Sequence, residues 1–216
     1  MTRIVVVPLG AWEQHGPHLP PDTDTLIISA VAGAACGTSA GVVLAPALPI
    51  TASDEHRGFD TTLSIGTEAF AASVVAIARS AAWADGVLFV NGHGGNADGL
   101  SIAREAMDHE GLRHDVWSLP AYEGADVHAG RTETSVMLHL HPNLVDMSRA
   151  TAGNPAPLGE IIGTMRTEGV RAVSPTGVLG DATRATAAHG RAVFAMWVSS
   201  LSQRLQGLVS EWAPRA

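Results

Sequence analysis

Short runs of consecutive apolar residues alternate along this chain with longer segments whose apolar residues recur every three or four positions. Continuous apolar runs bounded by turns predict strands that are buried on both faces, and the longer spacing predicts amphipathic helices. The predicted strands are 4–8, 42–46, 86–90 and 115–119. The predicted helices are 25–36, 68–83, 98–109, 133–139 and 187–212. Strands alternating with helices favour a three-layer α/β/α fold with a mostly parallel central sheet.

The last predicted helix carries the clearest apolar stripe. Its large apolar residues, three or four positions apart, are Phe194, Trp197, Leu201, Leu205, Leu208 and Trp212. Such a stripe is typical of a helix that packs on the core of its own domain, and a seam between subunits is the alternative.

Length and composition indicate an ordinary soluble α/β protein. The 216 residues suit one domain with a substantial core, so we expect a single domain over 1–216. The apolar stretches are interrupted by polar residues before they reach the length of a membrane span. The chain begins with a predicted strand and not with a basic leader, so we expect a cytoplasmic protein with no membrane partner.

Charge and residue usage exclude several kinds of chemistry. The net charge of −8 argues against a nucleic-acid partner. All 13 basic residues are arginines, which excludes a Schiff-base lysine, a lysine for pyridoxal phosphate and a P-loop lysine. The single cysteine, Cys36, lies among small residues of a predicted helix and is best interpreted as a packed small side chain. Ten histidines are more than expected and direct attention to metal or acid–base chemistry.

The first polar cluster follows the first predicted strand. Glu13 and His15 are two positions apart, so on an extended segment their side chains point the same way. Asp24 follows at the start of a predicted helix, where a carboxylate is electrostatically favoured. Carboxylates and a histidine on one loop fit a metal site, but a polar turn with an incidental histidine fits these residues equally well.

Two further clusters occur where the pattern changes from one element to the next. Small residues around His93, in the segment 91–96, favour close approach of this histidine to a metal over an incidental place in a glycine-rich turn. Glu133 lies in the first turn of a predicted helix and His128 in the loop before it. A carboxylate ligand beside an acid–base histidine suits metal-assisted hydrolysis. Taken alone, however, this segment favours a capping box with Thr132 or a neighbour as the cap and with Glu133 in contact with solvent.

Taken together, these motifs resemble the creatininase family of metal-dependent amidohydrolases. The resemblance rests on Glu13-x-His15, Asp24 and the segments 91–96 and 128–135. Three more segments resemble the branch of this family that processes mycofactocin precursor peptide, and they extend the match over most of the chain: 53–59, 62–66 and 174–181. The resemblance implies a creatininase-like α/β/α fold.

The resemblance also implies a metal centre with two divalent ions per subunit, either zinc, iron or manganese. The implied metal ligands are Glu13, His15, Asp24, His93 and Glu133. Asp24 would bridge the two ions. Creatininase carries a glutamate two residues after the histidine that corresponds to His93, whereas this chain has Gly95, so Glu133 would supply the missing ligand.

The activity implied by the resemblance is a peptidase or amidohydrolase that releases the C-terminal Val-Tyr-derived portion of a modified precursor peptide. His128 would protonate the leaving nitrogen, and Glu133 would also orient the attacking water. The implied assembly is a homo-oligomer. The alternatives are creatinine hydrolysis, deformylation of a formylaminopyrimidine on the same centre, and a metal-binding scaffold without catalysis.

Two departures from the family pattern affect the expected pocket. Asp60 and Thr61 stand where relatives usually carry Pro-Gly, so the turn differs or Asp60 adds a carboxylate near the pocket. The tryptophans that cover the substrate in creatininase have no clear equivalents, and the nearest candidates are Trp117 and Tyr122.

Overall fold

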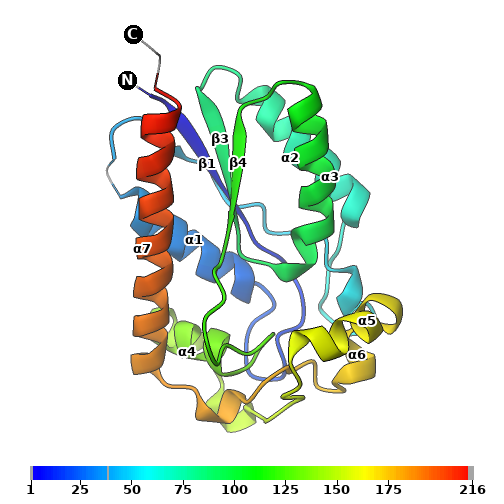
Figure 1. Ribbon diagram of the computed structural model, residues 1–216. Helices are drawn as coiled ribbons and strands as arrows, with labels where there is room; N and C mark the ends of the chain where they lie inside the picture. The colour runs from blue at the N-terminus through cyan, green and yellow to red at the C-terminus, as the bar shows by residue number, and fades with distance from the viewer. Residues whose placement is uncertain (1, 38, 214–216) are drawn as a thin grey trace.

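The computed structural model of this protein describes residues 2–37 and 39–213, and within them four parallel strands form one sheet (Figure 1). The strands are β1 (Ile4–Leu9), β2 (Val42–Leu44), β3 (Gly86–Asn91) and β4 (His114–Ser118), in the order β2-β1-β3-β4. Every residue of β1 and β3 is buried, which explains why these two strands are continuous apolar runs. All four predicted strands are confirmed. The second is shorter than predicted and ends before Pro46, which has no N–H group to extend the ladder.

Helices cover both faces of the sheet. They are α1 (Thr23–Cys36), α2 (Thr67–Ser80), α3 (Ala97–His109), α4 (Arg131–Leu140), α5 (Leu158–Glu168), α6 (Val170–Val173) and α7 (Ala187–Glu211). Ile4 and Val6 of β1 pack into a core with α1, α4 and α7, while Val5 and Val7 face a second core with α2 and α3. Figure 1 shows α7 and α2/α3 on opposite sides of the strands. The predicted α/β/α layering is confirmed.

The C-terminal stripe lies in the core of this chain. Trp197, Leu201, Leu205 and Leu208 on α7 are buried, and they pack with apolar residues of α1 and β3. The core interpretation of this helix is therefore confirmed for these side chains. Along the part of the chain that the structure covers, no helix is both long and apolar enough to cross a membrane.

Two helices, α5 and α6, were not predicted from the sequence. α5 and α6 lie between the predicted helices 133–139 and 187–212, and their apolar residues form a small cluster with Leu179 apart from the two main cores. Both helices contact the 3-10 turn Asp54–His56 (η1). These helices therefore support a turn that lies far away in the sequence.

Close packing of α7 on α4 depends on Gly190. A Cβ atom at this position would lie 1.8 Å from the carbonyl oxygen of Ser135 in α4, a distance that real Cβ atoms do not reach. At Gly207, on the same helix, a Cβ atom would meet only side-chain atoms of Arg204 and Glu211 at 3.6 Å, which is ordinary contact. The packing of α7 on α4 therefore requires a glycine at position 190, whereas position 207 has room for a larger residue.

We expect Gly190→Ala to lower the free energy of unfolding by about 1–3 kcal/mol, because the added methyl group forces α7 away from α4. Gly207→Ala is the matched control and is expected to raise it by about 0.5–1 kcal/mol, because alanine favours the helix. Urea unfolding of both variants measures these changes. Equal effects of the two substitutions would contradict this explanation of the helix contact.

Candidate metal centre

The polar clusters of the sequence meet at one edge of the sheet. Glu13 and His15 follow the end of β1, and His93 follows the end of β3. Asp24 lies in the first turn of α1, and Glu133 in the first turn of α4. Parallel strands place their carboxyl ends at the same edge, where ligands of such folds gather. The structure thus brings together all the residues predicted as metal ligands.

Asp24 lies at the middle of this group. Its Oδ1 is 3.1 Å from Nε2 of His15, and its Oδ2 is 3.1 Å from Nδ1 of His93. Two sets of donor atoms share it, with the atoms of each set within 4.8 Å of one another: His15, Asp24 and Glu133 form one, and Glu13, Asp24 and His93 form the other. A carboxylate whose two oxygens face different histidines has the arrangement needed to bridge two cations.

Backbone carbonyl groups orient both histidines. Nδ1 of His15 lies 3.1 Å from the carbonyl oxygen of Glu13, and Nε2 of His93 lies 2.8 Å from that of Ala52. A carbonyl oxygen only accepts hydrogen bonds, so these two nitrogens donate. In neutral rings, Nε2 of His15 and Nδ1 of His93 would carry the lone pairs, and both nitrogens face Asp24. Histidines that bind metals are typically held in this way.

Glu13 is a buried carboxylate without hydrogen bonds. Its side chain has no exposed surface, and neither Oε1 nor Oε2 accepts a hydrogen bond. The nearest nitrogens are Nε2 of His56, 3.3 Å from Oε1, and Nε2 of His93, 3.2 Å from Oε2. Burial raises the pKa of Glu13 to about 8. A buried carboxylate is stable only when its charge is compensated, so this residue supports a cation at its oxygens.

The electrostatics of the whole cluster favour positive charge between the donors. Burial opposes the charged form of His15 and His93, but Asp24 beside His15 and Glu13 beside His93 raise the pKa of both histidines to about 10. Burial raises the pKa of Glu133 to about 7. Divalent cations would supply the same positive charge to this set of carboxylates and imidazoles. These ligand types suit zinc, iron and manganese.

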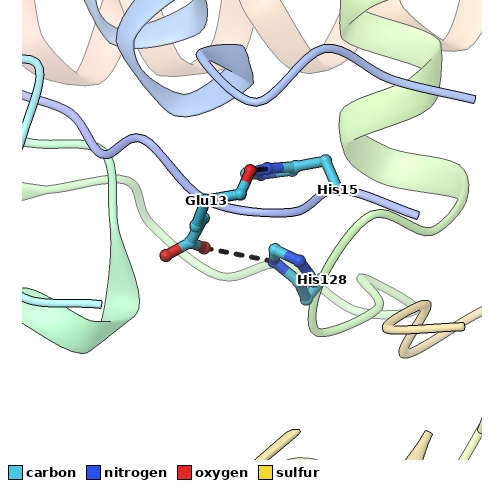
Figure 2. A group of neighbouring side chains, drawn as sticks. All are labelled: Glu13, His15 and His128. Carbon is cyan, nitrogen blue, oxygen red and sulfur yellow. Dashed lines mark hydrogen bonds and ion pairs between the residues drawn. The ribbon is translucent and has the colours of Figure 1, made fainter. Parts of the chain in front are cut away.

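His128 reaches the centre from the loop before α4. Figure 2 shows its ring beside Glu13 and His15, with Nδ1 3.7 Å from Oε1 of Glu13. Its Nε2 donates a hydrogen bond to the carbonyl oxygen of Gln14, 2.9 Å away, so Nδ1 is the nitrogen free to exchange a proton. Burial and the charge on His15 lower the pKa of His128 to about 3. The ring is therefore neutral at pH 7.

Glu133 belongs to the His15 side of the centre. Its Oε2 accepts a hydrogen bond from the backbone N–H of Ala129 at 2.5 Å and lies 3.8 Å from Nε2 of His15. The capping box considered for this segment is wrong, because the residue before α4 is Gly130, which has no side chain to cap the helix, and Thr132 already lies inside the helix. Asp126 accepts hydrogen bonds from the first backbone N–H groups instead, which leaves the Glu133 carboxylate facing His15.

Three residues at the centre were not predicted as site residues. His56 and Glu55 come from η1, and Oε1 of Glu55 lies 3.5 Å from Nε2 of His93. The Gln14 side-chain Nε2 donates a hydrogen bond to Nδ1 of His56 at 2.9 Å, and it lies 3.2 Å from Nε2 of His128. The signal for the first two was the run Asp54-Glu55-His56, which was recognised only as part of a loop that resembles the family.

A cavity of about 360 Å³ opens beside the centre. The residues of its wall include Gln14, His15, Phe59, Asp60 and Arg171. Arg171 places its guanidinium group 5.6 Å from the centre of the Phe59 ring. The cavity therefore joins His15, one of the predicted metal ligands, to an aromatic ring and to charges of both signs.

Trp117 and Tyr122, the candidates for covering the substrate, do not line this cavity. Trp117 packs in the core, where its Nε1 donates to Oγ of Ser200 at 3.2 Å. Tyr122 packs against the same core, and its hydroxyl group lies 3.0 Å from Nε2 of His189. The prediction for both residues is wrong, because each side chain is held in the layer of α4 and α7. Phe59 is the aromatic residue of the cavity wall.

The two departures from the family pattern, Asp60 and Thr61, both lie at this cavity. The expectation that Asp60 adds a carboxylate near the pocket is therefore confirmed. Thr61 has a φ of +72°, in the left-handed region that favours glycine. A threonine here is strained, because its branched Cβ is crowded in this conformation.

Comparison with known proteins relates the chain to hydrolases. Residues 1–205 match the family model described as "Creatininase: Creatinine amidohydrolase". The chain is 47% identical over 220 residues to the mycofactocin precursor peptide peptidase of Mycobacterium ulcerans, with 97% of this chain and 86% of the relative covered. The relative of the same name from Mycolicibacterium smegmatis is 46% identical, with 99% and 87% covered. Creatinine amidohydrolase from Pseudomonas putida is 28% identical, with 71% and 70% covered.

Solved structures show the same fold. A structure described as "Creatininase Mn" superposes with a TM-score of 0.78 at 23% identity, covering 98% of this chain and 92% of the other. A crystal structure of creatinine amidohydrolase gives a TM-score of 0.77 at 24% identity, covering 99% and 92%. With a family match over nearly its whole length and relatives at 46–48% identity, this chain belongs to the creatininase family.

Proposed function

We propose that this protein is a metal-dependent peptidase that cleaves an amide bond of a modified mycofactocin precursor peptide and releases its C-terminal Val-Tyr-derived portion. The observation that carries the chemistry is Asp24, whose two oxygens face His15 and His93 beside an open cavity. The substrate is supported by relatives at 46–48% identity that are named mycofactocin precursor peptide peptidase.

Two divalent cations, either zinc, iron or manganese, would be held by residues that the structure groups around Asp24. His15, Asp24 and Glu133 would hold one, and Glu13, Asp24 and His93 the other. Such cations, when bound, lower the pKa of a water molecule toward about 7 and polarise an amide carbonyl group. The buried oxygens of Glu13, which accept no hydrogen bond, support this assignment.

The protein's own residues would position the reactants and move the proton. The cavity admits the peptide beside His15, and Glu133 orients the attacking water. His128 is neutral, so Nδ1 first takes a proton from that water and then gives it to the leaving nitrogen. A carbon–oxygen bond forms, the carbon–nitrogen bond breaks, and the products are a carboxylate and an amine.

Creatinine hydrolysis and deformylation of a formylaminopyrimidine would use the same centre. The creatinine amidohydrolase relative is only 28% identical, and Trp117 lies in the core and not at the cavity. Both facts favour the peptide over creatinine. A scaffold without catalysis predicts that His128 is replaceable without consequence. The homo-oligomer and the cytoplasmic location stay predictions.

The substrate assignment is tested by incubating the metal-loaded protein with modified precursor peptide, and separately with creatinine and a formylaminopyrimidine. We expect mass spectrometry to detect the C-terminal dipeptide-derived product from the peptide and no turnover of the two small molecules. Turnover of either small molecule with an intact peptide would contradict the proposed substrate.

The bridging role of Asp24 predicts the metal content of Asp24→Asn. An asparagine side chain has one oxygen and no charge, so it cannot link two cations. We expect wild-type protein to hold more than one equivalent of metal per chain by elemental analysis, and the variant to hold one equivalent or less. Wild-type protein that is active without metal would overturn the mechanism.

The role of His128 predicts that His128→Ala retains its metal content and loses turnover by at least about a hundredfold. His109→Ala, an exposed histidine at the end of α3, is the control and should keep full turnover. Metal analysis and peptide cleavage are measured on the same samples. Loss of metal from the His128 variant would instead make this residue a ligand.

A further inference from the structure

Glu55 belongs to neither of the two ligand sets, yet its carboxylate lies at the same centre. Its Oε1 is 3.5 Å from Nε2 of His93, on the ring edge away from the nitrogen that faces Asp24. With Glu13 and His56 it forms a further set of donors that lie within 4.8 Å of one another. Glu55 therefore adds a third carboxylate on the side of the centre occupied by Glu13 and His93.

The Glu55 carboxylate can lie beside His93 because Gly95 has no side chain. A Cβ atom on Gly95 would lie 2.0 Å from Oε1 of Glu55 and 2.4 Å from Nε2 of His93. Both distances are far below the contact distance of carbon with oxygen or nitrogen. The Glu55 carboxylate thus fills space that any side chain at position 95 would need.

The turn that carries Glu55 is held in place from outside the centre. α5 and α6 contact η1, and at Gly169, between these helices, a Cβ atom would lie 3.0 Å from the carbonyl oxygen of Glu55. The neighbouring acid, Asp54, accepts a hydrogen bond from Oγ of Ser64 at 2.7 Å and pairs with Arg57 at 3.0 Å. The two adjacent carboxylates therefore have separate partners, and only Glu55 lies at the centre.

The charges of this group call for a cation. Glu13 is fully buried, and its two oxygens accept no hydrogen bond, while Glu55 lies within 4.8 Å of it with 22% of its side chain exposed. When both are ionised, two carboxylates this close repel each other in a medium of low dielectric constant. A divalent cation between them turns this repulsion into attraction. Glu133 cannot serve here, because it lies on the His15 side.

We propose that Glu55 is a ligand of the cation on the Glu13–His93 side of the centre, in the space left by Gly95. This inference rests on the proposed metal centre. The two cations then have carboxylate ligands from different parts of the chain: Glu133 from α4 on one side, and Glu55 from η1 on the other, with Asp24 between them.

The test is a titration of metal-free protein with Zn²⁺ against a competing chromophoric chelator. Wild-type protein should show two sites. Glu55→Gln keeps the shape and removes the charge, so one site should weaken at least about tenfold while the other is unchanged. Asp54→Asn removes the same charge one residue away and should bind like the wild type. Thermal unfolding of the metal-free variants confirms that each is folded.

A second variant, Glu55→Asp, keeps the charge but shortens the side chain, and it should weaken the same site by a smaller factor. Unchanged Zn²⁺ binding in Glu55→Gln, or an equal loss in Asp54→Asn, would overturn the assignment of Glu55 and leave the proposed function standing. Wild-type protein that binds no Zn²⁺ would overturn the metal centre itself.

Discussion

Burial of like charge is the constraint on which the rest of this structure depends. Glu13, Asp24, Glu55 and Glu133 lie close together at one edge of the sheet, and the first two have almost no contact with solvent. Carboxylates removed from water in this way are unstable unless positive charge lies between them. Two features hold such a cluster in place. Backbone carbonyl groups orient His15 and His93, and the loops that carry these histidines follow the fully buried strands β1 and β3.

The fold reduces the cost of this arrangement. Asp24 and Glu133 each lie in the first turn of a helix, where the helix dipole favours negative charge. Glu13, His15 and His93 come from loops after β1 and β3, adjacent strands whose carboxyl ends lie side by side, and Glu55 comes from η1. Segments that are far apart in the sequence therefore meet at this edge of the sheet. The two cores, one with α2 and α3 and the other with α1, α4 and α7, fix the strands and helices that carry these segments.

Much of this was accessible from the sequence. The apolar runs of β1 and β3 and the long stripe of α7 predicted the layered fold, and the three polar clusters do meet at the edge where parallel strands end. α5 was missed because Gly159 and Gly163 weaken its helical pattern, and its few apolar residues pack away from the sheet. Glu55 was missed for a related reason: its place depends on contacts with α5 and α6 and on the space at Gly95, neither of which is visible in local spacing.

The segment of α5 and α6 contacts both the cavity and the candidate metal centre. It supplies Arg171 to the cavity wall and supports the turn that carries Glu55 and His56 at the centre. A substitution in this segment that reshapes the cavity wall therefore also acts on the turn that carries Glu55 and His56. The shape of the cavity and the position of these two side chains cannot be changed independently through α5 and α6.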